Sequence, residues 1–106
     1  EQGMAMYRDP TLAGLLANNL GNVLQARGRN AEAEAYLREA LAAMRDLRDD
    51  LELGNVLGVL GEVVAAQGRR AEAEGYWREA IALLERFPDD MRAQHLLGVP
   101  RRNLGL

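Results

Sequence analysis

The chain repeats itself with a period of 40 residues. Residues 9–48 align without a gap on residues 49–88, and 17 of the 40 paired positions are identical. The clearest match pairs residues 28–40 with residues 68–80, where the pattern Gly-Arg-X-Ala-Glu-Ala-Glu recurs. A period of about 20 to 50 residues is typical of stacked arrays. Such arrays bind other molecules far more often than they transform them, so the repeat predicts a class of function but not the partner.

Each unit predicts two helices joined at a glycine. In the first unit Asp9 can cap a helix and Pro10 fits the opening position, where its missing N–H costs nothing. Gly28 supplies a left-handed stop, and the second helix is expected to start after Asn30, a good cap. Residues at helical spacing predict the inward side of the first helix, which comprises Ala17, Leu20, Gly21 and Leu24.

The second unit carries the same signals. Asp49 caps with Glu52 three residues later, as in a capping box, and Gly68 marks the next stop. The helix after Gly68 must end near Pro88. Trp77 aligns with Leu37 and is expected in the core, although a binding role for the indole is the alternative. The inward side of the first helix of this unit comprises Leu57, Leu60, Gly61 and Val64.

Gly21 and Gly61 lie inside predicted helices, where a glycine costs roughly 1 kcal/mol relative to alanine. Close packing of two helices offsets that cost, so we expect Gly21 to face Ala33 and Gly61 to face Ala73.

The two units share one order of residues: Leu-Gly, a second Gly, an Ala, then Leu or an aromatic residue, and a final Ala. This spacing resembles that of the tetratricopeptide repeat family. The usual period in that family is about 34 residues. The period of 40 resembles the longer repeats of kinesin light chains and bacterial signalling regulators. The resemblance implies an all-α fold of antiparallel helix hairpins stacked into a right-handed superhelix, and a non-catalytic scaffold that binds a peptide or protein. The positions that carry it are Leu20, Gly21, Leu24, Gly28, Ala33, Leu37 and Ala40, then Leu60, Gly61, Val64, Gly68, Ala73, Trp77 and Ala80.

The repeat also divides the chain. We expect a single helical domain in which residues 1–8 end a preceding repeat, residues 9–48 and 49–88 are complete repeats, and residues 89–106 form a partial repeat or capping helix. In that last part a helix starts after Asp89 and Asp90, and Pro100 interrupts it.

Composition excludes several functions. The net charge is −3, with Arg and Glu interspersed, which disfavours a nucleic-acid surface. The sequence has no Cys, Ser or Lys and only one His and one Thr, so we expect no enzyme, no cofactor and no metal site. Apolar runs of only a few residues exclude a membrane span, and cytoplasm is the expected location. All thirteen basic residues are Arg, which indicates a GC-rich bacterial gene.

Carboxylates recur two residues apart where the second helix of each unit begins. Glu34 can pair with Arg38, and Glu74 with Arg78, four residues on. A solvated outer face explains these residues better than acid–base chemistry does.

The candidate binding residues lie on the first helix of each unit, away from its own partner helix. In the tetratricopeptide family this flank lines a concave groove. Amide side chains both donate and accept hydrogen bonds, so they can bond the N–H and C=O groups of an extended peptide. The alternative is that the asparagines are solvated or tie adjacent repeats together. The candidates are Leu15, Asn18, Asn22, Gln25, Asn55, Glu62 and His95.

The two ends predict a second possible function. Met4 and Tyr7 near one end, and Leu96, Leu97 and Leu104 near the other, are expected to form apolar end faces. Pairing of such faces with another copy would make the chain a self-assembly element, that is, a homo-oligomer.

Overall fold

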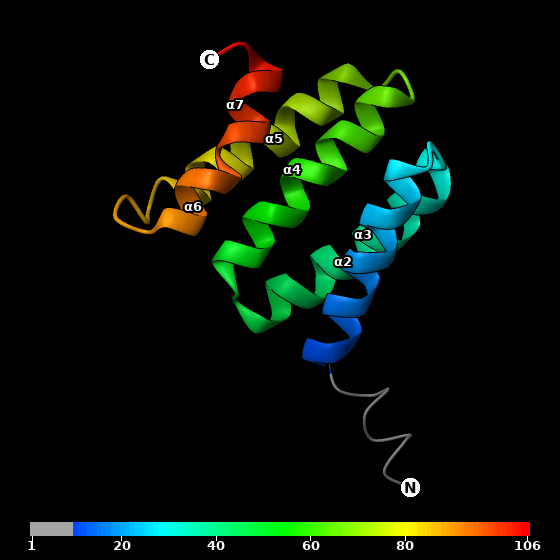
Figure 1. The fold of residues 1–106 in the computed structure, drawn as a ribbon, viewed down its shortest axis with the longest axis horizontal. Coiled ribbons are helices and arrows are strands. Elements are labelled where there is room, and N and C mark those ends of the chain that lie inside the picture. The colour runs from blue at the N-terminus through cyan, green and yellow to red at the C-terminus, as the bar shows by residue number, and fades with distance from the viewer. Residues whose placement is uncertain (1–9) are drawn as a thin grey trace, which may run out of the picture.

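The structure is a computed structural model, and it describes residues 10–106. Every regular element in that range is a helix (Figure 1). The helices are α2 (Pro10–Ala26), α3 (Asn30–Leu47), α4 (Asp50–Ala66), α5 (Arg70–Leu84), α6 (Met91–Leu96) and α7 (Gly98–Leu104). This confirms the all-α fold.

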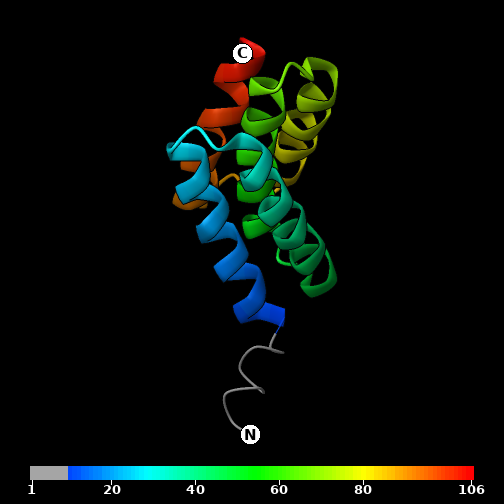
Figure 2. The same cartoon turned by 90° about the vertical axis from the view of Figure 1, so that its right-hand side faces the viewer.

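The helices form two hairpins and a broken terminal helix. α2 packs antiparallel to α3, α4 packs antiparallel to α5, and α3 joins the two hairpins by packing against α4. α6 and α7 then cover α4 and α5 from the far side (Figures 1 and 2). We call the side formed by α2, α4, α6 and α7 the first-helix face, and the side formed by α3 and α5 the second-helix face. The result is the predicted array of stacked hairpins.

Most of the predicted helix ends are confirmed. The side-chain oxygen Oδ1 of Asp49 accepts a hydrogen bond from the N–H of Glu52 at 3.1 Å, as an N-cap does. Gly28 and Gly68 adopt φ values of 75° and 84°, which favour glycine. The prediction for Asn30 is wrong by one residue. Asn30 is the first residue of α3, and the preceding cap residue makes no side-chain cap bond.

The break between α6 and α7 has a local cause. The N-terminal cap of α6 is Asp90, which accepts a hydrogen bond from the N–H of Ala93 at 3.0 Å. Pro100 lacks an N–H, and its ring crowds the carbonyl four residues earlier, at Leu96. The helix is therefore interrupted at Leu97, as the sequence predicts. Pro100 lies buried in the first turn of α7.

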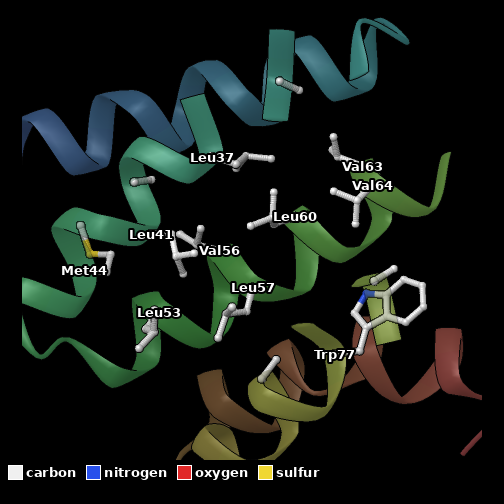
Figure 3. Packing of buried hydrophobic residues seen from close by; sticks show 14 of the residues in the cluster. Leu37, Leu41, Met44, Leu53, Val56, Leu57, Leu60, Val63, Val64 and Trp77 are labelled. Carbon is white, nitrogen blue, oxygen red and sulfur yellow. The ribbon is translucent and has the colours of Figure 1, made fainter. Parts of the chain in front are cut away.

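The core lies between α3 and α4 and between α4 and α5. Leu37 of α3 points towards Leu60 and Val63 of α4 (Figure 3). On the other side of α4, Trp77 is 1% exposed, and its Nε1–H donates to the carbonyl of Gly58 at 3.1 Å. The predicted core position of Trp77 is confirmed, and its only polar atom is satisfied inside the protein.

The helix glycines make room mainly for large side chains. A Cβ on Gly21 would lie 2.6 Å from Cγ of Leu37, whereas the nearest atom of Ala33 is its carbonyl oxygen at 3.4 Å. A Cβ on Gly61 would collide with the Trp77 indole. The three atoms nearest to that Cβ all belong to Trp77, so the main neighbour of Gly61 is the indole and not the expected Ala73. Two further glycines, which the sequence pattern did not single out, also make room for large side chains. Gly14 makes room for Met44, and Gly54 makes room for Leu84.

Leu20 departs from the expected inward side. It is 46% exposed, whereas its counterpart Leu60 is fully buried. The reason is position in the stack. α3 covers the side of α4 that carries Leu60, but within residues 10–106 no helix covers the same side of α2.

The three leucines expected to be exposed at the far end of the array are buried or half-buried. Leu97 is buried, and Leu96 and Leu104 are half-buried because they pack against the cores beneath them. The expectation that these three leucines form an exposed apolar face is therefore wrong, although Met91 and Leu106 in the same terminal segment are 88% and 80% exposed. Met4 and Tyr7 lie outside the described residues.

Candidate functional site

Glu62 lies at the centre of a polar cluster on the first-helix face. Its Oε1 accepts from Nε2 of Gln25 on α2 at 2.9 Å, and its Oε2 accepts from Nδ2 of Asn103 on α7 at 3.4 Å. Arg102 of α7 lies 3.8 Å from the same carboxylate. One carboxylate of α4 thus connects the first helices of successive units.

The sequence placed Gln25 and Glu62 on one surface, and the structure brings them together. It missed Asn103. The Asn103 amide of α7 donates to Glu62 and to the carbonyl of Val99, the latter at 2.9 Å. The proline at position 100 signalled the break, but the repeat alignment did not give the direction of the helix after it.

The other predicted residues split into accessible and buried ones. Asn22 and Asn55 are half-buried, and His95 and Leu15 are exposed. Within residues 10–106 the side chains of Asn22, Asn55 and His95 have no hydrogen-bond partner. Asn22 and Asn55 lie on α2 and α4, which also carry Gln25 and Glu62, whereas His95 lies on α6. The three polar groups remain available to a ligand.

Asn18 does not belong to the accessible set. It is only 6% exposed, and its Oδ1 has no hydrogen-bond partner in the described part of the chain. Asn18 lies two turns before Gln25 on the same side of α2, and Gln25 reaches α4. Because that side faces the next repeat, the expectation that Asn18 is surface-exposed is wrong.

The second-helix face carries the strongly interacting charges. Arg69 donates to both oxygens of Glu34, at 2.7 and 3.0 Å, and also to Glu72. Arg38 completes the cluster through Glu34 at 2.6 Å and Glu72 at 2.8 Å. Farther along the same helices, Arg45 pairs with Glu79 at 2.7 Å. These contacts join α3 of one repeat to the loop and helix α5 of the next.

The predicted pairs of Glu34 with Arg38 and of Glu74 with Arg78 are confirmed. The contacts between repeats were missed, since helical spacing describes neighbours on one helix and not the register of two. The hydrogen bonds from Arg69, with those from Arg38 and Gln67, lower the pKa of Glu34 to about 2 against an opposing effect of burial. Arg69 and then Arg38 also lower the pKa of Glu72. These charges stabilise the stack.

A pocket of about 270 Å³ lies between α5 and the end of the chain. Its walls are mostly apolar, and Glu85 at its edge pairs with Arg101 at 3.2 Å. The lining residues are Arg78, Ile81, Ala82, Glu85, Leu104 and Leu106. The described residues contain no group of three acidic or imidazole side chains placed to hold a metal ion. None of the described helices is long and apolar enough to cross a membrane.

The comparison with known families agrees with this architecture. The family model for the tetratricopeptide repeat matches residues 12–86, which include both hairpins. No curated protein and no solved structure matches the chain. The chain therefore belongs to the tetratricopeptide repeat family, a family of protein-interaction scaffolds.

Proposed function

We propose that this chain holds an extended peptide or protein segment against its first-helix face. The observation that carries the proposal is the contrast between the two faces. On the second-helix face, Glu34 and Arg69 satisfy one another. On the first-helix face, the amides of Asn22 and Asn55 have no partner among the described residues.

The chemistry of that face suits main-chain recognition. An amide side chain offers an acceptor and two donors, so Asn22 and Asn55 can each bond the N–H or C=O groups of an extended segment. Leu15, which is exposed beside them, can contact an apolar side chain of that segment. The Glu62 cluster fixes the relative positions of α2, α4 and α7 beneath the ligand.

The alternative role for the amides is to tie adjacent repeats together, and Gln25 fills that role instead of Asn22 or Asn55. Gln25 donates to Glu62 across the boundary between the first two units. Asn22 and Asn55 make no such contact within residues 10–106, and a binding role explains their unpartnered, half-buried amides better.

Selected peptides provide the test. A displayed library of random peptides is selected on the chain, and the affinity of one recovered peptide is measured by fluorescence anisotropy. The double variant Asn22→Ala/Asn55→Ala should bind it at least about tenfold more weakly, because two hydrogen bonds worth about 1 kcal/mol each are lost. The control, Glu39→Ala/Asp46→Ala, changes two exposed residues of α3 and should bind normally. The reverse pattern contradicts the proposal.

Self-assembly is the second candidate function, and one observation favours it. Leu16, Leu20 and Val23 form an exposed apolar stripe along α2, at the end of the array that no described helix covers. The leucines expected to form the counterpart at the other end are buried or half-buried, so the two ends differ.

A further inference from the structure

The helices that form the first-helix face differ in charge. α2 has no charged residue, and α4 carries only carboxylates, those of Asp50, Glu52 and Glu62. Residues 91–106, which include α6 and α7, carry three arginines and the only histidine of the chain, with no Asp or Glu. Among the helices of this face, positive charge is therefore confined to α6 and α7.

The carboxylates of α4 already have partners within the protein. Arg92 pairs with Glu52, and Arg86 pairs with Asp50 at 3.3 Å. The third carboxylate, that of Glu62, accepts hydrogen bonds on both oxygens from side-chain amides of α2 and α7. α4 therefore offers no unpartnered carboxylate that would attract a basic ligand.

Arg102 is the arginine of this end that keeps its donors free. Arg92 pairs with Glu52, and Arg101 pairs with Glu85 at 3.2 Å, whereas Arg102 lies 3.8 Å from its carboxylate and its side chain is 71% exposed. A distance of 3.8 Å is too long for a hydrogen bond, and a guanidinium has five N–H donors. Arg102 can therefore bind a carboxylate from outside through two parallel hydrogen bonds.

The register of the helices brings this cation close to the unpartnered amide of α4. Glu52 pairs with Arg92 and Glu62 lies beside Arg102, so α4 and the α6–α7 segment face one another with an offset of 40 residues. Asn55 lies between the two contacts on α4. Arg102 is seven residues, or about 10 Å along a helix, beyond the position opposite Asn55. About three extended residues span that distance, so one bound segment can reach both side chains.

We infer that the segment bound on the first-helix face carries an acidic side chain, and that Arg102 binds this carboxylate and selects for it. The inference rests on the proposed peptide binding and adds the charge of the partner. Asn22 and Asn55 bond main-chain groups, which every peptide has, so they contribute affinity without selecting a sequence. Arg102 supplies the sequence preference, because a segment without a carboxylate leaves the guanidinium unpaired.

Parallel selections test the inference. A library of random peptides, joined to its carrier through the C-terminus so that no terminal carboxylate is free, is selected on the unsubstituted chain, on Arg102→Gln and on Arg102→Glu. Peptides from the unsubstituted chain should be enriched in Asp or Glu at one position. Arg102→Gln should lose this enrichment, and Arg102→Glu should favour Lys or Arg there, since the charge that meets the segment is reversed.

The matched control is Arg78→Glu. Arg78 lies on α5, on the second-helix face, and resembles Arg102 in that its side chain is 69% exposed and 3.5 Å from its carboxylate partner. This variant should recover the same acidic peptides as the unsubstituted chain. Circular dichroism of each variant verifies that the helices form.

A cycle of affinities then joins the acidic residue to Arg102. One recovered peptide and an analogue in which its acidic residue is replaced by the corresponding amide are measured by fluorescence anisotropy. The analogue should bind the unsubstituted chain at least about tenfold more weakly, and Arg102→Gln should bind the two peptides equally. The first comparison requires no change in the protein, so it remains decisive if an Arg102 variant fails to fold.

The outcomes separate this inference from the proposed function. Binding peptides without an acidic preference, or an acidic preference that persists in Arg102→Gln, overturn the role of Arg102 and leave peptide binding on the first-helix face intact. A selection that recovers no binding peptide overturns both.

Discussion

The indole of Trp77 occupies the space that any side chain at position 61 would need. A Cβ on Gly61 would lie 2.6 Å from Cδ1 of the ring, and the ring is held in place by its hydrogen bond to the carbonyl of Gly58. The glycine and the indole form one packing unit between α4 and α5. The smaller pair of Gly21 and Leu37 occupies the same place in the first repeat.

Gly61→Ala should destabilise the fold by about 1 to 3 kcal/mol, because a rigid ring and a helix backbone must separate to admit one methyl group. Gly75→Ala is the matched control. Gly75 also lies inside a helix, but a Cβ there meets nothing within 4 Å, so alanine should stabilise by about 0.5 to 1 kcal/mol. Urea unfolding measures both. Equal changes in stability for the two variants would refute the packing account.

Trp77→Ala should cost about 3 to 5 kcal/mol, as deletion of a buried aromatic side chain does. Trp77→Phe keeps a ring but removes the hydrogen bond to Gly58, and should cost less. Trp77 is the only tryptophan in the chain, so its fluorescence is unambiguous. Native emission should be blue-shifted and should move to the solvated value on unfolding. Solvated emission from the folded protein would place the indole at the surface.

The low pKa of Glu34 predicts a specific acid sensitivity. A carboxylate whose pKa falls from 4.5 to about 2 on folding stabilises the folded state above pH 4.5, and this contribution is lost as the pH falls towards 2. Glu34→Gln should therefore be less stable than the unsubstituted chain at pH 7, and the difference should shrink below pH 4.5.

The control for this prediction is Glu39→Gln, which changes an exposed carboxylate on the same helix. It should follow the stability of the unsubstituted chain across the pH range. Chemical denaturation at a series of pH values gives the comparison. A gap between Glu34→Gln and the unsubstituted chain that stays constant down to pH 2 would show that Glu34 is not held ionised by its arginines.

Much of the fold could be predicted because most of the local sequence signals occur in both repeats. Asp49 as a cap, the left-handed Gly28 and Gly68, the buried Trp77 and the break before Pro100 all depend on near neighbours in the chain. Leu20 was misplaced for the opposite reason. Its burial depends on whether another helix covers α2, and helical spacing carries no information about that.

The proposed binding surface was predicted less completely for the same physical reason. Gln25 and Glu62 lie on matching sides of successive first helices, so repeat alignment was enough to bring them together. Asn18 is buried on the side of α2 that faces the next repeat, and Asn103 reaches Glu62 from α7, which follows the second complete repeat. Angles between helices follow from side-chain packing in three dimensions, which a one-dimensional pattern does not record.

Photo-cross-linking tests the central claim, that the first-helix face holds the ligand, most directly. A benzophenone amino acid is placed at position 55 in one variant and at position 39 of α3 in another, and each is irradiated with a labelled peptide selected on the unsubstituted chain. We predict a covalent adduct from position 55 that excess unlabelled peptide abolishes, and none from position 39. A competed adduct from position 39 without one from position 55 would place the ligand on the second-helix face and contradict the account.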